Sequence, residues 1–148
     1  MYSIAIVDDN EAWGFTLSLF LRQHNYSASA FTDPEAFSRL AQEFDLALVD
    51  FSIPSRRYQR DIDGPSLISK LKQQLEYPPL FVLISAYFTE EILRYPGDIC
   101  PEADICLSKS AGLSEILQCV DQLLSANEDF LAHRRSHRTE QVRVLFRS

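Results

Sequence analysis

The stretch LALVDF, residues 46–51, decides the fold, because it is apolar up to Val49 and then reaches the carboxylate of Asp50. A short apolar run that stops at a polar group is typical of a strand buried on both faces, as in a parallel sheet. Two further runs have the same character, one at 4–7 followed by acid and one at 80–85 ending in serine. The three runs predict the central strands of one sheet.

Stretches with a helical apolar period separate these runs. In residues 11–24 apolar side chains recur at i, i+4, i+7 and i+8, and Asp33 followed by proline is typical of a helix N-cap. Weaker strands are expected at 27–31 and 105–107. Five strands alternating with five helices predict an α/β fold, a doubly wound five-stranded parallel sheet with helices on both faces. The expected helices are 11–24, 33–44, one beginning at Gly64-Pro65, a short one at 89–94 and one at 113–124.

Length and composition fit one globular domain. The chain has 148 residues, of which 46% are hydrophobic and 24% charged, and a formal net charge of −7. Its apolar runs are too short to span a bilayer and its N-terminus lacks the basic region of a secretory signal, so we expect a cytoplasmic protein. The acidic balance argues against direct nucleic-acid binding. Three cysteines without CxxC spacing are expected as free thiols.

Polar groups follow four of the expected strands. The carboxyl ends of parallel strands lie at one edge of the sheet, where such folds bind their ligands, so these groups should converge. Three carboxylates close together raise one another's pKa values unless a cation binds. Oxygen ligands of this kind suit Mg²⁺, which is the predicted cofactor. In chain order the groups are Asp8, Asp9, Asp50, Ser85 and Lys109.

Taken in order, these motifs resemble a response-regulator receiver domain of bacterial two-component signalling, a CheY-like domain. The resemblance covers residues 2 to about 125 and implies the flavodoxin-like strand order 2-1-3-4-5. Any one motif is weak, but the ordered set is specific. The motifs are the pair Asp8-Asp9, the segment at 50–54, Ser85-Ala86, and Lys109 within ADICLSK at 103–109.

By this resemblance Asp50 is the phosphoacceptor, a nucleophile that takes a phosphoryl group from a sensor histidine kinase or a phosphotransfer protein. Lys109 would pair with one phosphoryl oxygen, and the Ser85 hydroxyl would bond another in the phosphorylated state. The implied function is a phosphorylation-controlled module that signals by binding another protein, with a homodimer as one option. It is not an enzyme that turns over an external substrate.

The resemblance also implies the ligands of the magnesium ion. Asp9 would bind the ion directly and Asp8 through water. Asp50 and the backbone carbonyl of Ser52 would complete the protein ligands, and Pro54 would shape the loop that follows.

Several features depart from the family pattern. The insert SRRYQRDI at 55–62 precedes Asp63-Gly64 and is either a solvated loop or a positive surface presented to the kinase or the phosphoryl group. Cys106 stands where the family has an aromatic switch residue, and Tyr87 is hypothesised to take part of that role or to shield the acyl phosphate. Ser110 stands where the family commonly has a proline. These changes fall on the face used for output, so we expect an atypical partner surface.

Residues 126–148 lie beyond the resemblance, which assigns a receiver domain to 1–125. This segment carries a charge of +2 and is expected to be a C-terminal extension or linker, with a helical extension, a self-association arm and the start of a longer linker left open. His133 and His137 could share a helical face, but two histidines are weak support for a metal site.

Two other functions remain open from the sequence. One is a pseudo-receiver that binds partners without phosphorylation. The other is a phosphohydrolase with an aspartate nucleophile, which would require a DxD pattern where the chain has Asp8-Asp9-Asn10. A nucleotide-binding enzyme is disfavoured because the glycine-rich phosphate loops are missing from the sequence.

Overall fold

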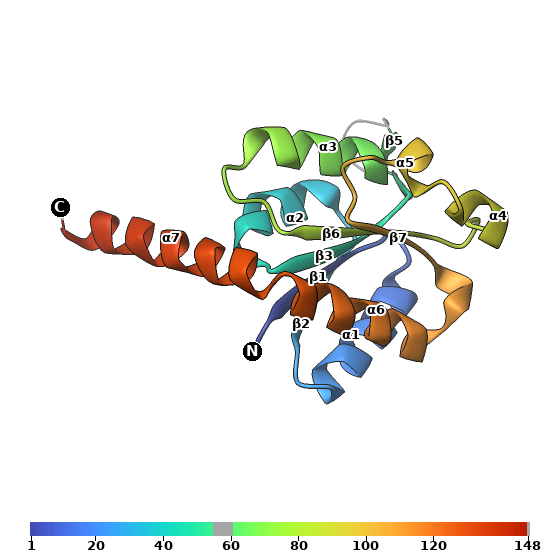
Figure 1. Cartoon of the computed structure of the whole chain (residues 1–148), viewed down its shortest axis with the longest axis horizontal. Helices are drawn as coiled ribbons and strands as arrows, with labels where there is room; N and C mark the ends of the chain where they lie inside the picture. The colour runs from blue at the N-terminus through green and yellow to red at the C-terminus, as the bar shows by residue number, and fades with distance from the viewer. Residues whose placement is uncertain (55–60, 148) are drawn as a thin grey trace.

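The computed structural model describes residues 1–54 and 61–147, and its centre is one parallel sheet (Figure 1). The strand order is β2-β1-β3-β6-β7, which confirms the predicted order 2-1-3-4-5. Neighbouring strands pair in parallel throughout. The strands are β1 Ser3–Val7, β2 Ser27–Phe31, β3 Leu46–Asp50, β6 Leu80–Ser85 and β7 Ile105–Ser108.

Helices cover both faces of the sheet, as the alternation predicted (Figure 1). Along β1, Ile4 and Ile6 join the apolar cluster on the side of α1 and α6, whereas Ala5 and Val7 join the cluster on the side of α2 and α3. All four side chains are fully buried, which is why the strand is apolar throughout. The helices are α1 Glu11–Gln23, α2 Pro34–Leu40, α3 Gly64–Gln74, α4 Glu90–Leu93, α5 Pro96–Ile99, α6 Leu113–Ala126 and α7 Glu128–Arg147, with single 3-10 turns at Ala41–Glu43 and Lys109–Ala111.

Polar caps set the starts of the helices that flank the strand ends. The side chains of Asn10, Asp33 and Asp63 each accept a backbone N–H from the first turn of α1, α2 and α3 respectively. The N-cap predicted at Asp33 is confirmed. These bonds satisfy donors that a helix leaves free at its N-terminus.

Two regions refine the expected chain path. β4 (Ser52–Pro54) and β5 (Asp61–Asp63) form an antiparallel hairpin that was not predicted. The three arginines of the insert lie outside the described residues, so their role stays a prediction. The short helix expected at 89–94 is confirmed as α4, with Thr89 as its N-cap. A second short helix, α5, begins at Pro96 and was not predicted. Across the described ranges, no helix is both long and apolar enough to cross a membrane.

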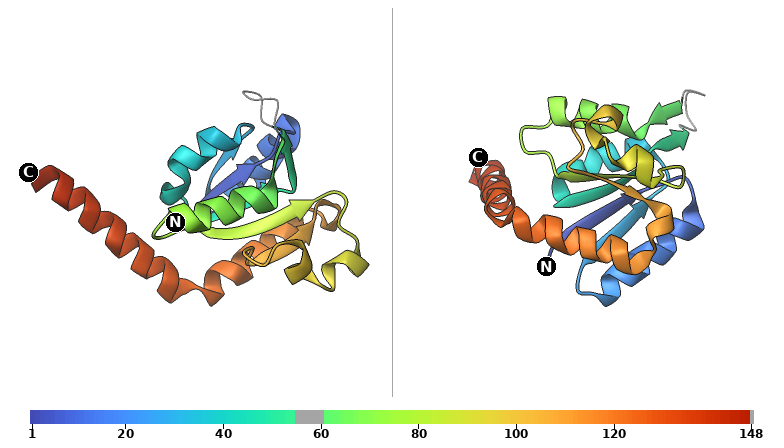
Figure 2. Two further views of the ribbon diagram at one scale, coloured as in Figure 1. Left: turned by 90° about the horizontal axis from the view of Figure 1, so that it is seen from above. Right: turned by 45° about the vertical axis from the view of Figure 1, so that its right-hand side comes forward.

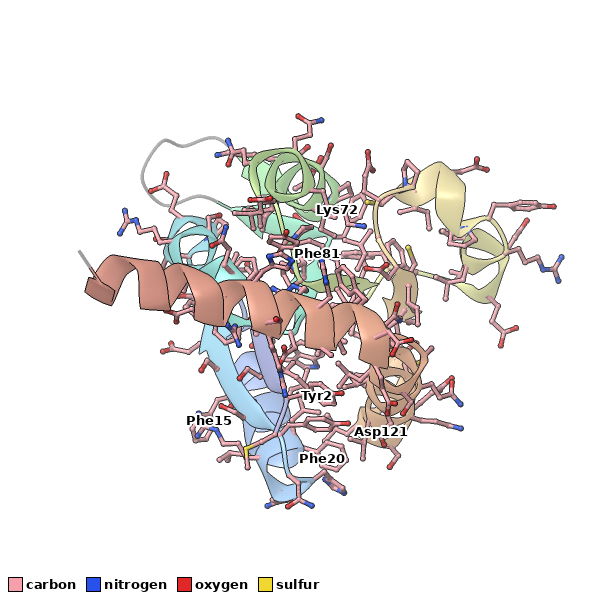
Figure 3. All side chains as sticks on the ribbon, turned by 60° about the vertical axis from the view of Figure 1, so that its left-hand side comes forward. Tyr2, Phe15, Phe20, Lys72, Phe81 and Asp121 are labelled. Carbon is pink, nitrogen blue, oxygen red and sulfur yellow. The ribbon has the colours of Figure 1, made fainter. Side chains whose placement is uncertain are left out.

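The C-terminal extension is a helix, and its first half packs against the sheet. Leu131 is 1% exposed and joins the core cluster on the α6 side. Figure 3 shows α7 crossing the end of the sheet at which the strands begin, near Tyr2, over whose ring Arg135 lies at 4.7 Å. His133 and His137 do share a helical face, with ring centroids 4.3 Å apart. The rest of α7 extends beyond the sheet (Figure 2).

A buried carboxylate anchors α7. Asp45, just before β3, is 1% exposed, and its Oδ2 accepts the Ser3 N–H at 2.8 Å and an Arg135 N–H at 3.2 Å. Its Oδ1 lies 3.7 Å from a nitrogen of Arg134, which is 4% exposed. Burial lowers the pKa of Arg134 to about 10, against the opposing effect of Asp45. The guanidinium also donates to main-chain carbonyls of Gln42 and of the loop before β6.

We predict that Asp45→Asn lowers the free energy of unfolding by about 3–5 kcal/mol, because it leaves the buried Arg134 without its counter-charge. Urea unfolding followed by circular dichroism measures this change. Glu43→Gln, an exposed carboxylate on the preceding turn, is the control and should stay close to the wild type. Equal midpoints for Asp45→Asn and the wild type would show that the anchor contributes nothing.

Candidate functional site

Four of the predicted site residues lie together at the carboxyl edge of the sheet. β1 leads to Asp8 and Asp9, and the neighbouring β3 ends at Asp50. One carboxylate oxygen from each lies within 4.8 Å of the others. Lys109 follows β7 directly, and its ammonium nitrogen is 3.5 Å from Asp50 Oδ1. The strand ends therefore converge in space.

The three carboxylates differ in their surroundings. Asp8 is 2% exposed and Asp50 is 8% exposed, whereas Asp9 is open to solvent. Asp8 Oδ1 accepts the Asn10 N–H at 2.8 Å. Among the described residues Asp8 Oδ2 finds no hydrogen-bond donor of good geometry, but it lies 2.5 Å from Lys109 Nζ. Lys109 is therefore held more closely by Asp8 than by Asp50.

The surroundings of Asp50 disfavour the charged form of its carboxyl group. Burial and, next, the negative charge of Asp8 raise its pKa to about 6, against the opposing effect of Lys109. At neutral pH the carboxylate still predominates, but at a cost in free energy. Perturbed groups of this kind concentrate at functional sites, and a divalent cation with oxygen ligands would relieve the repulsion.

Gly64 allows α3 to approach Asp50 closely. Its N–H donates to the Phe51 carbonyl at 2.6 Å. A Cβ here would come within 2.3 Å of the Asp50 carbonyl oxygen and 2.8 Å of Leu83. Glycine alone fits without a shift of the backbone. The sequence pair Asp63-Gly64 therefore closes the site on the α3 side.

Ser85 and Ser52, the other two predicted site residues, occupy adjacent chain segments. Ser85 ends β6, the strand paired with β3, and is 2% exposed. Its Oγ accepts the Tyr87 N–H at 3.1 Å, which leaves the hydroxyl hydrogen to donate. Ser52 begins β4, two residues after Asp50. The assignment of its carbonyl as a metal ligand stays a prediction.

A hydrogen-bonded turn holds Lys109 at the end of β7. Ser108 Oγ accepts the Ser110 N–H at 3.2 Å and shares a hydrogen bond with Ser110 Oγ at 2.7 Å. Ser108 thereby caps the short turn Lys109–Ala111. Two serines thus form the turn in which the family commonly has a proline.

Trp13 is a site residue that the sequence analysis missed, because it was interpreted as part of the apolar stripe of 11–24. The Lys109 ammonium lies over its ring, 4.5 Å from the centroid. Trp13 also packs against the core cluster on the α1 side. The sequence feature that could have identified it is its place in the first turn of the helix that follows the acidic pair.

The aromatic residues around Asp50 differ from those expected. Tyr87, hypothesised to take part of the switch role, is 85% exposed. Its neighbour Phe88 is 8% exposed and packs edge-on against Phe51, with centroids 5.7 Å apart. Cys106 packs at the same cluster, and burial raises the pKa of its thiol. The three cysteines are free thiols, as predicted.

Comparisons with known proteins give matches in structure. No family model matches the sequence, and neither does any curated protein. A CheY-like receiver domain protein from Methanospirillum hungatei JF-1 is 19% identical, covers 87% of this chain and 98% of its own, and superposes with a TM-score of 0.69. The receiver domain of Francisella response regulator 1452 is 18% identical, covers 86% of this chain and 99% of its own, and has a TM-score of 0.70.

A third solved structure contains a modified aspartate. It is a response regulator from Burkholderia pseudomallei with a phosphorylated aspartic acid, a calcium ion and citrate. It is 22% identical over 79% of this chain and 65% of its own, with a TM-score of 0.60. Together these similarities show that the chain has the CheY-like receiver fold, which confirms the resemblance at the level of fold.

We predict that Asp50→Asn raises the free energy of unfolding at pH 7 by about 1–3 kcal/mol, because asparagine cannot carry the disfavoured charge. The folded state holds the Asp50 proton more tightly than the unfolded state. The stability contributed by this carboxyl is therefore full below its ordinary pKa of 3.8 and is lost as pH rises through about 6.

Urea unfolding in EDTA at several pH values tests this prediction. The gap between Asp50→Asn and the wild type should shrink steadily as the buffer is made more acid than pH ~6. Asp98→Asn removes an exposed carboxylate and should show no such gap. A variant less stable than the wild type at pH 7 would refute the unfavourable charge at Asp50.

Proposed function

We propose that the chain is a phosphorylation-controlled receiver that takes a phosphoryl group on Asp50 from a sensor histidine kinase or a phosphotransfer protein. The observation that carries this proposal is the group of three carboxylates with Lys109 between Asp8 and Asp50, on a CheY-like fold. The protein signals by binding another protein and has no external substrate to turn over.

Asp50 is the nucleophile in this proposal. Its pKa of about 6 leaves a carboxylate at neutral pH. A carboxylate oxygen bonds to phosphorus as the bond from phosphorus to the donor's leaving group breaks, which produces an acyl phosphate. Lys109 is 3.5 Å from Asp50 Oδ1 and pairs with a phosphoryl oxygen. The Ser85 hydroxyl donates a hydrogen bond to another phosphoryl oxygen.

The oxygen atoms that these residues offer as ligands fit Mg²⁺. Asp8, Asp9 and Asp50 offer carboxylate oxygens from one small region, and the Ser52 carbonyl adds a neutral oxygen. When bound, the ion neutralises charge on the carboxylates and on the transferred phosphoryl group. The phosphorylated aspartate and calcium ion in the Burkholderia regulator support a divalent cation at this site.

The outer face of α1 provides a docking surface for the phosphoryl donor. Phe15 is 59% exposed and Leu19 is 41% exposed, and they stand four residues apart on the helix that begins beside Asp9. Residues at this spacing share one helical face. An exposed apolar pair on the helix that begins next to the acidic pair suits a helix of the donor protein, which must bring its phosphohistidine to Asp50.

Incubation with acetyl phosphate and Mg²⁺ tests the chemistry. The wild type should gain one phosphoryl group by intact mass, and Asp50→Asn should gain none. Replacing Mg²⁺ by EDTA, or Asp9 by asparagine, should slow labelling by about tenfold or more, because the phosphoryl charge is then unneutralised. Asp98→Asn should label like the wild type.

Each alternative has its own outcome in this assay. An unlabelled wild type would favour the pseudo-receiver, which binds partners without phosphorylation. Repeated turnover of a generic phosphate ester would favour the phosphohydrolase. Stoichiometric labelling that depends on Asp50 fits only the proposed receiver.

The docking surface is tested separately with a histidine phosphotransfer protein that labels the wild type. Phe15→Ser combined with Leu19→Ser should slow transfer from that protein by about tenfold, the usual effect of losing an apolar contact at an interface. Labelling by acetyl phosphate should not change. The control is Tyr95→Ser, at a residue 67% exposed between α4 and α5. Equal slowing with both donors would rule out a docking role.

A further inference from the structure

Trp13 and Lys109 form a contact that joins α1 to the β7 side of the site. The ammonium nitrogen lies 4.5 Å from the centroid of the indole. It is at the same time 2.5 Å from Asp8 Oδ2 and 3.5 Å from Asp50 Oδ1. Lys109 is only 16% exposed in this position. Two carboxylates and an aromatic face together hold its charged group out of solvent.

The backbone of Trp13 is tied to the acidic pair. Asp8 Oδ1 accepts the Asn10 backbone N–H at 2.8 Å, and Asn10 Oδ1 accepts the Trp13 backbone N–H at 3.0 Å. Trp13 is half-buried against the core cluster on the α1 side. A closed ring of contacts therefore runs from Asp8 through Asn10, Trp13 and Lys109 back to Asp8.

The carboxylate contacts of Lys109 weaken when the site is filled. A divalent cation would be held, directly or through water, by the same carboxylates that now face the ammonium, and would repel it. Without another partner the ammonium would turn to water, because a long lysine side chain gains entropy there. An indole face attracts a cation through its quadrupole but carries no formal charge. It can hold the ammonium without neutralising it, which a carboxylate cannot do.

We propose that Trp13 is the positioning residue for Lys109, and that its indole keeps the ammonium beside Asp50 when a cation draws Asp8 away. This inference rests on the proposed phosphorylation of Asp50. In that step an Asp50 oxygen bonds to phosphorus, the phosphorus–oxygen bond of acetyl phosphate breaks, and acetate leaves with the electron pair. Lys109 stays protonated and bonds a phosphoryl oxygen.

Fluorescence tests the contact without any phosphorylation. Trp13 is the single tryptophan of the chain, so all tryptophan emission comes from it. Lys109→Met should change the emission maximum or intensity. Lys72→Met should leave the emission unchanged, because Lys72 pairs with Asp104 elsewhere on the molecule. Identical spectra for the wild type and Lys109→Met would overturn the proposal.

Phosphorylation rates test the positioning role. At saturating acetyl phosphate and Mg²⁺, Trp13→Leu should lower the labelling rate by about 3- to 10-fold, the range expected for losing a cation–π contact. Trp13→Phe keeps an aromatic face and should recover most of the rate. Phe20→Leu, at the other half-buried aromatic residue of the same helix, should have no effect. Equal rates for Trp13→Leu and Trp13→Phe would overturn the role.

A double-mutant comparison separates positioning from folding. In a Lys109→Met background, Trp13→Leu should cause no further loss of rate, because the group to be positioned is gone. The same loss in both backgrounds would mean a structural role and would overturn the inference. A wild type that is never labelled would refute the proposed function, whereas labelling that is insensitive to Trp13 would refute only its positioning role.

Discussion

The parallel pairing of β1 with β3 places like charges side by side. The register runs through Val7 opposite Val49 and continues directly into Asp8 and Asp50. Two buried carboxylates so close repel each other, yet the strands cannot slide apart, because their apolar side chains are buried on both faces of the sheet. The short ion pair to Lys109 and the fit to a divalent cation follow from that repulsion. The pKa of Asp50 is raised first by burial and then by the same repulsion.

The two ends of β3 show how one residue type serves two purposes. Asp45, before the strand, is met by two arginines of α7 and by a backbone N–H. Asp50, at its end, faces another carboxylate and shares a single lysine with it. The first is a structural anchor whose charge is compensated. The second is left with unbalanced charge, which suits a group that binds a cation and reacts.

Departures from the family pattern are accommodated locally around the site. Ser108 and Ser110 build the turn that carries Lys109. Cys106 is too small to repeat the movement of an aromatic ring, and the aromatic pair next to Asp50 is instead the half-buried Phe51 with the buried Phe88. The charged groups at the carboxyl edge of the sheet thus match the family pattern, whereas the residues around them depart from it.

The sequence by itself determined the strands, most helix starts and the candidate site, because these depend on local patterns. Apolar runs, N-caps and polar groups at strand ends can be recognised from neighbouring residues. The family resemblance supplied the strand order. The tertiary structure alone decided which distant side chains meet. Two of these contacts join segments far apart in the sequence, namely the indole of Trp13 over Lys109 and the docking of α7 on Asp45. The third is the β4–β5 hairpin, which forms around the insert. No local period encodes such contacts, because they depend on how completed elements pack against each other.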